Sequence, residues 1–374
     1  MNIPNYKNVF ICATEQSGDN IGSCIINELL INNKNIKFDG VGGSKISPFL
    51  NNQYFSLNDF KSIGIFEILP SLIKYIKMII FLSKKIISNN YDLVITIDSP
   101  DFNYPLVKRI RKKKYNKKVI QIVAPTVWAW REYRAKKFAK LFDEIFILFN
   151  FENSYFSKFK LKTTFIGHPI FYIENRNKIK KDNYIAFLPG SRLSEVKKLF
   201  NFFQIAYEQL VIINPDITIF IPTLPHLEKI ISVYVDRWKI QTIITTDKIL
   251  IEKYYLISKF ALVCSGTASL EIAKRKIPQL VIYKLNFLTE IILKKFVKVR
   301  YANIINIIAN KMIVPELTNS SLTKKKFIKY FVNLITDFDS NEKQIIAINS
   351  YLKQLESNQP PFTIAAKKID EYLQ

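Results

Sequence analysis

The stretch YIAFLPGSRLSEV, residues 184–196, joins an apolar run to a helical pattern through one short turn. Residues 184–188 predict a buried strand, and a helix is expected after Arg192. Gly190 lets the backbone approach a ligand closely, and free N–H groups at a helix start favour an anion. Arg192 adds a planar guanidinium that suits phosphate oxygens. The turn of Gly190, Ser191 and Arg192 is therefore either a phosphate site or an ordinary turn with a surface arginine.

The same order of apolar strand, turn and helix recurs along the chain. Continuous apolar strands between helix-length segments are typical of a parallel sheet that is covered on both faces. Most of the nine glycines follow a predicted strand, and ligands of open α/β sheets bind outside those strand ends. The predicted strands are residues 9–13, 92–98, 119–124, 144–149, 163–167, 184–188, 217–221, 260–264 and 279–284.

The polar stretch FYIENRNKIKKDN, residues 171–183, interrupts this pattern and indicates a linker. We therefore expect an α/β protein of two Rossmann-like domains that face a cleft, residues 1–170 and 171–345. A helical segment, 346–374, is expected to close the chain and to pack on the N-terminal domain or on a partner.

Composition limits the classes of function only loosely. Lys and Arg number 55 against 31 Asp and Glu, which gives a net charge of +24. Such a charge suits nucleic acid, anionic lipid or phosphorylated substrates, or it reflects codons rich in A and T. The three cysteines form no C-x-x-C pair, so neither a disulfide framework nor a zinc site is indicated and a reducing cytosol fits. No apolar run is long enough for a transmembrane helix or a signal peptide.

Two loops of the N-terminal half carry candidate chemistry. ATEQSGDNIG, residues 13–22, contains Glu15 and opens a helix that Ser17 or Asp19 could cap. It matches neither the dinucleotide fingerprint nor a P-loop. ITIDSPDFN, residues 95–103, ends a buried strand with Asp98, where a carboxylate can act as a general base. For Asp101 we favour a helix cap.

Two further loops are rich in ligand-binding residue types. APTVWAWREYRAKK, residues 124–137, holds Trp128 and Arg131 and is either an acceptor surface that binds a phosphate or an aromatic corner with a solvated basic face. CSGTASLE begins at residue 264 and repeats the strand–turn–helix order with Ser265, Gly266 and Thr267, a second candidate phosphate site. Glu271 lies one helical turn beyond Thr267, where it can face the same ligand.

Taken in order, these segments resemble the lipid-A-disaccharide synthase family over nearly the whole chain. The segments that carry the resemblance are SGDNIGSCII, SIGIFEIL, IDSPDFN, PTVWAWR, FIGHP, LPGSRLSEV, SGTASLE and VPEL. The family consists of inverting glycosyltransferases of the two-domain GT-B type that need no cofactor. The resemblance implies transfer from UDP-2,3-diacylglucosamine to 2,3-diacylglucosamine 1-phosphate, with residues 1–170 for the acceptor and 171–345 for the UDP-sugar.

The resemblance also implies roles for single residues. Asp98 would take the proton of the acceptor 6-hydroxyl, while Arg192 and the Ser265–Thr267 turn would hold the donor diphosphate. Glu271 would bind the ribose. Asn306 and Glu316 match polar positions of the donor side, although the segment before Asn306 lacks the family's usual proline.

Metal chemistry is not expected. The single D-x-D, residues 337–339, matches no motif and predicts a solvated loop, and arginines with helix starts would neutralise the leaving UDP instead. His168, in the GHP turn, either lines the cleft or is structural.

Two rival functions are also compatible with the sequence. The net charge suggests a nucleic-acid-binding protein, but no known module is present and no nucleic acid is expected as a partner. Another GT-B enzyme that uses a UDP-sugar, such as an epimerase or a peptidoglycan-type transferase, would share the donor site.

Residues 71–88, SLIKYIKMIIFLSKKIIS, favour a lipid acceptor. Their lysines fall on one face of a helix that is otherwise apolar, as in helices that lie in a membrane interface. The alternative is a helix of the protein core with one solvent-exposed face. Residues 286–300 show a similar mixture. We therefore expect a cytoplasmic protein, peripheral on the inner face of the inner membrane, and consider a homodimer possible.

Overall fold

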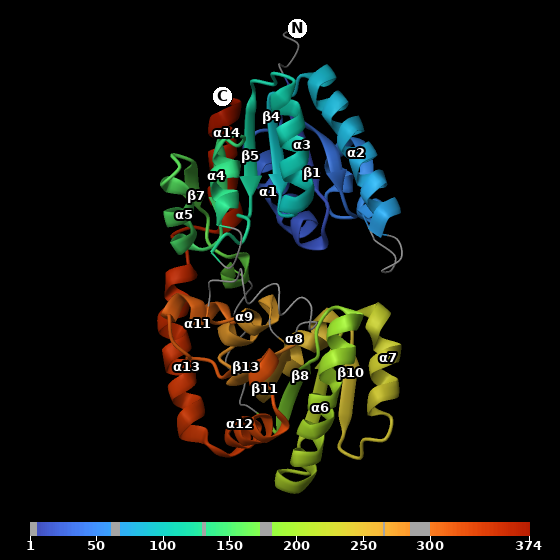
Figure 1. Cartoon of the computed structure of the whole chain (residues 1–374), viewed down its shortest axis with the longest axis vertical. Coiled ribbons are helices and arrows are strands. Elements are labelled where there is room, and N and C mark those ends of the chain that lie inside the picture. The colour runs from blue at the N-terminus through green and yellow to red at the C-terminus, as the bar shows by residue number, and fades with distance from the viewer. Residues whose placement is uncertain (1–5, 61–67, 129–131, 173–181, 265, 285–299) are drawn as a thin grey trace. The chain divides into compact units, whose positions relative to one another are not determined.

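The computed structural model describes residues 6–60, 68–128, 132–172, 182–264, 266–284 and 300–374 (Figure 1). The chain forms two compact units. Unit 1 comprises residues 1–172 together with 355–374, and unit 2 comprises residues 173–354. Most of the expected linker, 171–183, and nearly all of the segment 286–300 lie outside the described residues.

Unit 1 is built on a seven-stranded sheet in the order β3-β2-β1-β4-β5-β6-β7, in which every pairing is parallel. The strands are β1 (Lys7–Ala13), β2 (Ile36–Gly42), β3 (Leu50–Ser56), β4 (Leu93–Ile97), β5 (Lys118–Ile122), β6 (Glu144–Ile147) and β7 (Lys162–Phe165). The helices are α1 (Gln16–Asn32), α2 (Ile68–Asn89), α3 (Pro100–Lys112), α4 (Tyr133–Ala139), α5 (Asn153–Ser157) and α14 (Pro361–Leu373).

Apolar side chains cover both faces of this sheet. Alternate residues of β1 belong to different cores: Phe10 packs with residues of α2 and α3, whereas Ile11 packs with residues of α1 and α14. A strand buried on both faces must be apolar throughout, which explains the uninterrupted apolar run VFICA. Residues at the far end of the chain, such as Ile369 of α14, are thus part of the core of unit 1.

Unit 2 repeats the arrangement with a six-stranded parallel sheet in the order β10-β9-β8-β11-β12-β13. The strands are β8 (Tyr184–Leu188), β9 (Thr218–Pro222), β10 (Thr242–Thr245), β11 (Ser258–Cys264), β12 (Gln279–Tyr283) and β13 (Glu316–Thr318). The helices are α6 (Leu193–Ile213), α7 (Pro225–Val235), α8 (Lys248–Ile257), α9 (Thr267–Lys274), α11 (Ile304–Ala309), α12 (Lys324–Thr336) and α13 (Phe338–Leu352).

Both sheets follow the strand order of the Rossmann fold, in which the order of successive strands across the sheet reverses beside the first strand. The expected fold class is therefore confirmed for each unit. Strands β2, β3, β10 and β13 were not predicted, because three of them are edge strands with polar or short sequences and β2 is interrupted by Gly40. Residues 337–339 do not form a solvated loop: Asp337 caps α13, and its Oδ1 accepts the N–H of Ser340 at 3.0 Å.

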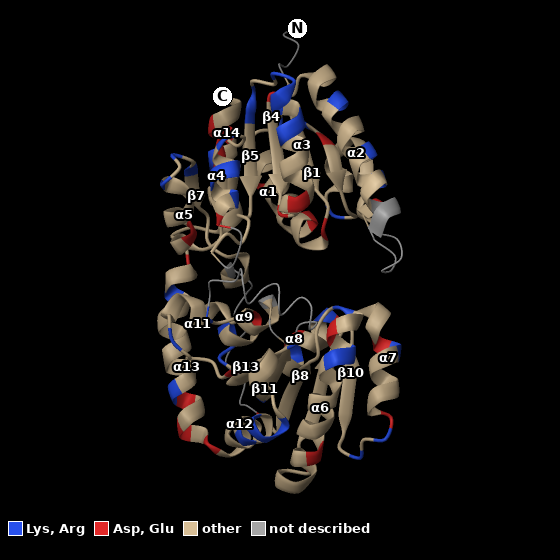
Figure 2. Ribbon diagram, in the orientation of Figure 1, with Lys and Arg blue, Asp and Glu red and all other residues tan. Residues whose placement is uncertain are grey.

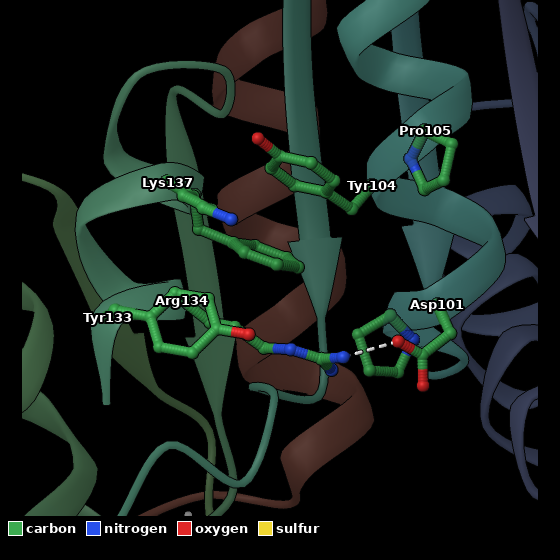
Figure 3. Close-up of a pocket in the computed structure, with 8 residues that line it drawn as sticks. Asp101, Tyr104, Pro105, Tyr133, Arg134 and Lys137 are labelled. Atoms are coloured by element: carbon green, nitrogen blue, oxygen red, sulfur yellow. Dashed lines mark hydrogen bonds and ion pairs between the residues drawn. The ribbon is translucent and has the colours of Figure 1, made fainter. Parts of the chain in front are cut away.

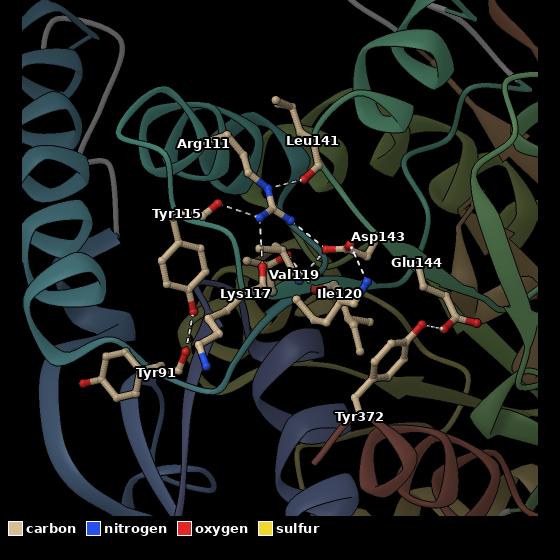
Figure 4. Close-up of polar contacts among 12 residues, drawn as sticks. Tyr91, Arg111, Tyr115, Lys117, Val119, Ile120, Leu141, Asp143, Glu144 and Tyr372 are labelled. Atoms are coloured by element: carbon tan, nitrogen blue, oxygen red, sulfur yellow. Dashed lines mark hydrogen bonds and ion pairs between the residues drawn. The ribbon is translucent and has the colours of Figure 1, made fainter. Parts of the chain in front are cut away.

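Charged residues occur on many elements of both units (Figure 2). One cluster has a structural role, because the Arg111 guanidinium near the end of α3 donates to the carbonyls of Tyr115 and Lys117, each at 2.8 Å, and to Asp143 at 2.6 Å (Figure 4). Asp143 also accepts the N–H of Val119 at 2.8 Å. These bonds tie the end of α3 to the starts of β5 and β6.

A buried carboxylate attaches α14 to the sheet. Glu144 is fully buried, and its oxygens accept the hydroxyls of Thr164 and Tyr372, each at 2.5 Å (Figure 4). The ammonium of Lys162 lies 3.5 Å from the same carboxylate. Because a buried charge is costly unless it is well bonded, Tyr372 contributes to the stability of unit 1.

Replacing Tyr372 with Phe should therefore destabilise unit 1 by about 1.5–3 kcal/mol, the usual value of a hydrogen bond to a charged group. Urea denaturation followed by circular dichroism measures the change. Tyr155→Phe is the matched control, because the Tyr155 hydroxyl bonds to no group among the described residues. Equal midpoints for the Tyr372 variant and the unmodified protein would contradict this role.

Candidate active site

The first group of predicted residues gathers at the carboxyl edge of the sheet of unit 1. Strands β1 and β4 are neighbours, with Ala13 opposite Ile97, so the loops that follow them lie side by side. Ser17 donates from Oγ to Asp98 Oδ2 at 2.8 Å, and Ser99 donates from its N–H to Asp98 Oδ1 at 2.9 Å. The Ser99 hydroxyl donates to Glu15 at 2.9 Å. Glu15, Ser17 and Asp98 thus form one network, linked by Ser99, which the sequence did not single out.

The backbone at Asp98 is held in an uncommon conformation. Asp98 and Ser99 have φ values of 53° and 43°, in the left-handed region that is disfavoured for side chains other than Gly. Two buried amides stabilise the turn, because Asn103 and Gln121 both donate to the Asp98 carbonyl, at 2.8 and 3.0 Å. The turn leaves Asp98 partly exposed at the end of a buried strand. Strain that is locked by buried partners is typical of functional sites.

The helix-capping expectations for this region are wrong. Helix α1 begins at Gln16 without a side-chain cap, since Ser17 bonds to Asp98 and the buried Asp19 bonds elsewhere. Asp19 accepts the N–H groups of Gly43 and Ile46 at 2.7 and 3.0 Å. Asp101 lies inside the first turn of α3, after the N-cap residue Ser99, and its carboxylate pairs with Arg134.

A pocket of about 570 Å³ opens beside this network. Its walls come from the loop after β1, from the loop after β2 that Asp19 holds, and from β3 with the turn that follows it. Most of the groups are polar and uncharged, as expected for a site that binds hydroxyl groups. The lining residues are Thr14, Glu15, Gln16, Gly43, Ser44, Ser47, Gln53, Ser56, Leu57, Asn58 and Phe60.

Trp128 and His168 meet in an aromatic cluster of unit 1. The Trp128 indole N–H donates to Glu152 at 3.1 Å, and its ring packs edge-on against Phe151. Phe149 stacks on both Phe151 and His168. Burial lowers the pKa of His168 to about 4, so this imidazole is neutral near pH 7, and its Nδ1 accepts the N–H of Ile170 at 3.2 Å.

Glu152 is a residue that sequence reasoning missed. Its carboxylate accepts the N–H of Phe149 as well as the Trp128 indole. Burial nevertheless raises the pKa of Glu152 to about 8, because desolvation outweighs these hydrogen bonds. A Glu after an aromatic run gives no signal in the sequence by itself, and only the fold brings it to Trp128.

In unit 2, the turn of Gly190, Ser191 and Arg192 lies where predicted, between β8 and α6. Gly190 has φ +115°, and a Cβ there would lie 2.7 Å from the Glu195 carboxylate and 3.4 Å from Cys264 Sγ. The N–H groups of Ser191 and Arg192 donate to Glu195 at 3.1 and 3.2 Å, and the Arg192 guanidinium donates to it at 3.1 Å. The N–H groups expected to meet an anion are thus occupied by the carboxylate of Glu195, while the Arg192 side chain is 75% exposed.

The second turn of unit 2 lies next to the first, because β8 and β11 are paired with Leu188 opposite Val263. Gly266 precedes α9, and Thr267 is its first residue. Glu271 lies on α9; burial raises its pKa, and its carboxylate accepts no hydrogen bond among the described residues. Ser265 and Arg131, both predicted site residues, lie outside the described residues.

Asn306 and Glu316 bond to each other and to the surrounding backbone. Asn306 Nδ2 donates to Glu316 at 3.2 Å, and its Oδ1 accepts the N–H groups of Ile313 and Val314 at 2.7 and 2.8 Å. Glu316 accepts the N–H of Asn303 at 2.8 Å. Both side chains are buried, so they fix the segment 302–316. Within the part of the chain that is described, no group of His, Cys, Asp and Glu side chains has the arrangement of a metal site.

Two Rossmann-like units, each with polar loops at the carboxyl edge of its sheet, have the α/β architecture of the GT-B fold. Solved structures share the fold: MurG from Acinetobacter baumannii has 12% identity and a TM-score of 0.61, covering 98% of this chain and 100% of that one. UDP-GlcNAc 2-epimerase from Neisseria meningitidis, solved with UDP-GlcNAc, has 14% identity and a TM-score of 0.60, with 98% and 99% covered. Both likenesses concern the fold alone.

The sequence comparisons decide the family. The profile of the lipid-A-disaccharide synthetase family matches residues 9–367. The lipid-A-disaccharide synthase of Rickettsia prowazekii (strain Madrid E) is 35% identical over 379 residues, which cover 98% of this chain and 99% of that protein. The chain belongs to the lipid-A-disaccharide synthetase family.

The titration of Glu152 should be visible in the pH dependence of stability. Between its ordinary pKa and about 8, the folded protein keeps this proton and the unfolded chain does not. The free energy of unfolding therefore falls as pH rises through that window and levels off above it. Glu152→Gln cannot titrate, so its stability relative to the unmodified protein should improve from pH 5 to pH 8.

Urea denaturation at several pH values between 5 and 9 measures this difference. Glu356→Gln, at an exposed position of unit 1, serves as the control and should show no such trend. A difference between Glu152→Gln and the unmodified protein that stays constant with pH would mean that Glu152 is ionised in the folded protein.

Proposed function

We propose that the protein joins UDP-2,3-diacylglucosamine to 2,3-diacylglucosamine 1-phosphate and releases UDP, by a single displacement with inversion. The observation that carries the proposal is the Asp98 carboxylate, held at a strained turn beside a polar pocket in a chain of this family. Unit 1 would bind the acceptor and unit 2 the UDP-sugar.

In this proposal Asp98 acts as the general base. Each of its oxygens accepts one hydrogen bond from the protein, and an ionised carboxylate oxygen has room for another. The acceptor 6-hydroxyl can therefore donate to Asp98 while Ser17 and Ser99 keep the carboxylate oriented. Proton removal as the new bond forms offsets the weak nucleophilicity of an alcohol, and such help is worth about 10²–10⁴-fold in rate.

On the donor side, the proposal assigns the diphosphate to Arg192 and the start of α9. The guanidinium is largely exposed and is oriented by Glu195, so it can meet phosphate oxygens in a bidentate manner. Glu271 would accept the ribose hydroxyls, since its half-buried carboxylate has no hydrogen-bond donor of its own among the described residues. Asn306 and Glu316 would contribute by holding the segment 302–316 in place.

Helix α2 supports a membrane surface as the place of action. It exposes large apolar side chains, including Leu72, Ile73 and Ile76 at 52%, 52% and 48%, together with lysines. Exposed apolar surface with cationic residues is the pattern of an interfacial helix. None of the described helices is both long and apolar enough to span a bilayer. We propose that the protein is cytoplasmic and lies on the inner face of the inner membrane. That the protein forms a homodimer stays a prediction.

Asp98→Asn tests the mechanism. The variant keeps an oxygen for the Ser99 N–H, and its Nδ2 can donate to the Ser17 hydroxyl, so it should fold and bind UDP normally and lose at least about a hundredfold in kcat. UDP release from the two lipid substrates measures turnover, and calorimetry measures UDP affinity. Asp92→Asn, at the opposite end of β4, is the control for stability alone. Near-full turnover by the Asp98 variant would remove it as the base and make Glu15 the next candidate.

Sedimentation with anionic vesicles tests the membrane assignment. The protein should bind at low salt and be released by salt with detergent. Replacing Ile73 and Ile76 with Ser should weaken binding by at least about tenfold, because two exposed apolar side chains are lost. Ile212→Ser removes an equally apolar side chain, 76% exposed on α6 of unit 2, and should not weaken it. Equal losses in both variants would refute an interfacial role for α2.

A further inference from the structure

A second, smaller pocket of unit 1, with a volume of about 150 Å³, lies between α3 and α4 (Figure 3). It shares no lining residue with the polar pocket beside Glu15. Side chains from α4 point across it toward α3, whose first residues directly follow the Asp98 turn. The lining residues are Pro100, Asp101, Tyr104 and Pro105 from α3, and Tyr133, Arg134, Lys137 and Phe138 from α4.

The charged groups of this pocket favour an anion. Two cations, Arg134 and Lys137, face one carboxylate, Asp101. The Arg134 side chain is only 17% exposed, whereas its ion-pair partner Asp101 is 77% exposed (Figure 3). A half-buried guanidinium needs an anion beside it. Because Asp101 lies mostly in solvent, a ligand anion can take its place at low cost.

Neutral donors complete the lining. Tyr104 on α3 and Tyr133 on α4 both line the pocket, and each carries a phenol hydroxyl (Figure 3). Neither hydroxyl has a hydrogen-bond partner among the described residues. The Lys137 ammonium lies 4.6 Å from the centre of the Tyr133 ring, within the range of a cation–π contact.

The pocket is also largely preformed. The Tyr104 ring packs against Phe138 at 5.5 Å between centres, and Phe138 stacks on Phe142 in the core. Pro100 and Pro105 stiffen the α3 side. A pocket with this packed wall that offers a guanidinium, an ammonium and two hydroxyls matches a phosphate monoester, which presents several acceptor oxygens and two negative charges near neutral pH.

We propose that this pocket binds the 1-phosphate of the acceptor sugar, an inference that rests on the proposed function. Asp101 follows Asp98 by three residues, and three residues reach at most about 10 Å. That distance is on the scale of one phosphorylated sugar ring. An acceptor with its 6-hydroxyl at Asp98 can therefore place its phosphate against Arg134 and Lys137.

The test compares two acceptors, 2,3-diacylglucosamine with and without the 1-phosphate, in mixed micelles with a fixed donor. Lys137→Met and Arg134→Gln should each lower kcat/KM for the phosphorylated acceptor by about 10–100-fold, the value of one charge-assisted hydrogen bond. They should leave kcat/KM for the acceptor without phosphate, and KM for the donor, unchanged. Lys140→Met, an exposed lysine beyond the end of α4, is the matched control and should change none of these values.

Equal losses with both acceptors, or no loss with the phosphorylated one, would overturn the assignment. Weaker binding of Lys137→Met to phosphatidylglycerol vesicles, with unchanged kinetics, would assign the pocket to lipid headgroups and also overturn it. If the unmodified protein releases no UDP with either acceptor, the proposed function fails instead. The pocket is then judged by calorimetry with glucosamine 1-phosphate, which the unmodified protein should bind and Lys137→Met should not.

Discussion

The turn at Asp98 and Ser99 is the constraint on which the candidate site of unit 1 depends. Two consecutive residues with side chains adopt left-handed backbone angles there, and the buried amides of Asn103 and Gln121 hold the Asp98 carbonyl. This turn stops β4, starts α3 and points the carboxylate toward the loop after β1. Without it, Ser17 would lose its bond to Asp98, and Glu15 would lose its bond to Ser99. The motif IDSPDFN therefore specifies a backbone shape as much as a carboxylate.

Most of the fold could be predicted from apolar runs because the central strands are buried on both faces. β8, for example, was predicted with its observed bounds, residues 184–188. Edge strands escape this reasoning: β3, LNNQYFS, is buried on neither face and has no apolar periodicity. The break between α13 and α14 was also missed, although two prolines at 360 and 361 begin the last helix. Short polar segments such as β3 form strands only because the neighbouring strand offers hydrogen-bond partners.

The candidate site was predictable where a glycine or a carboxylate follows a strand, and was not predictable where side chains from distant segments meet. Asp98 and Gly190 belong to the first class. Glu152 belongs to the second, since it meets Trp128 only in the folded chain. Glu195 is a third case: it was inside a quoted motif, but its bonds to Ser191 and Arg192 depend on the path of the turn. The carboxylate of Glu195 thus accepts the two backbone N–H groups beside which the sequence analysis expected an anion.

The place of α14 in the core of unit 1 has a consequence for biosynthesis. Residues 173–354 form unit 2, so the polypeptide leaves unit 1, builds a complete second sheet and only then returns with Ile369 and Leu373 to cover the face of β1 that carries Ile11. During translation, unit 2 has all of its own strands while one apolar face of unit 1 is covered by α1 but still lacks α14. Because domains fold as their segments emerge, unit 1 completes its core only after unit 2 has been synthesised, although the strands of unit 1 are made first.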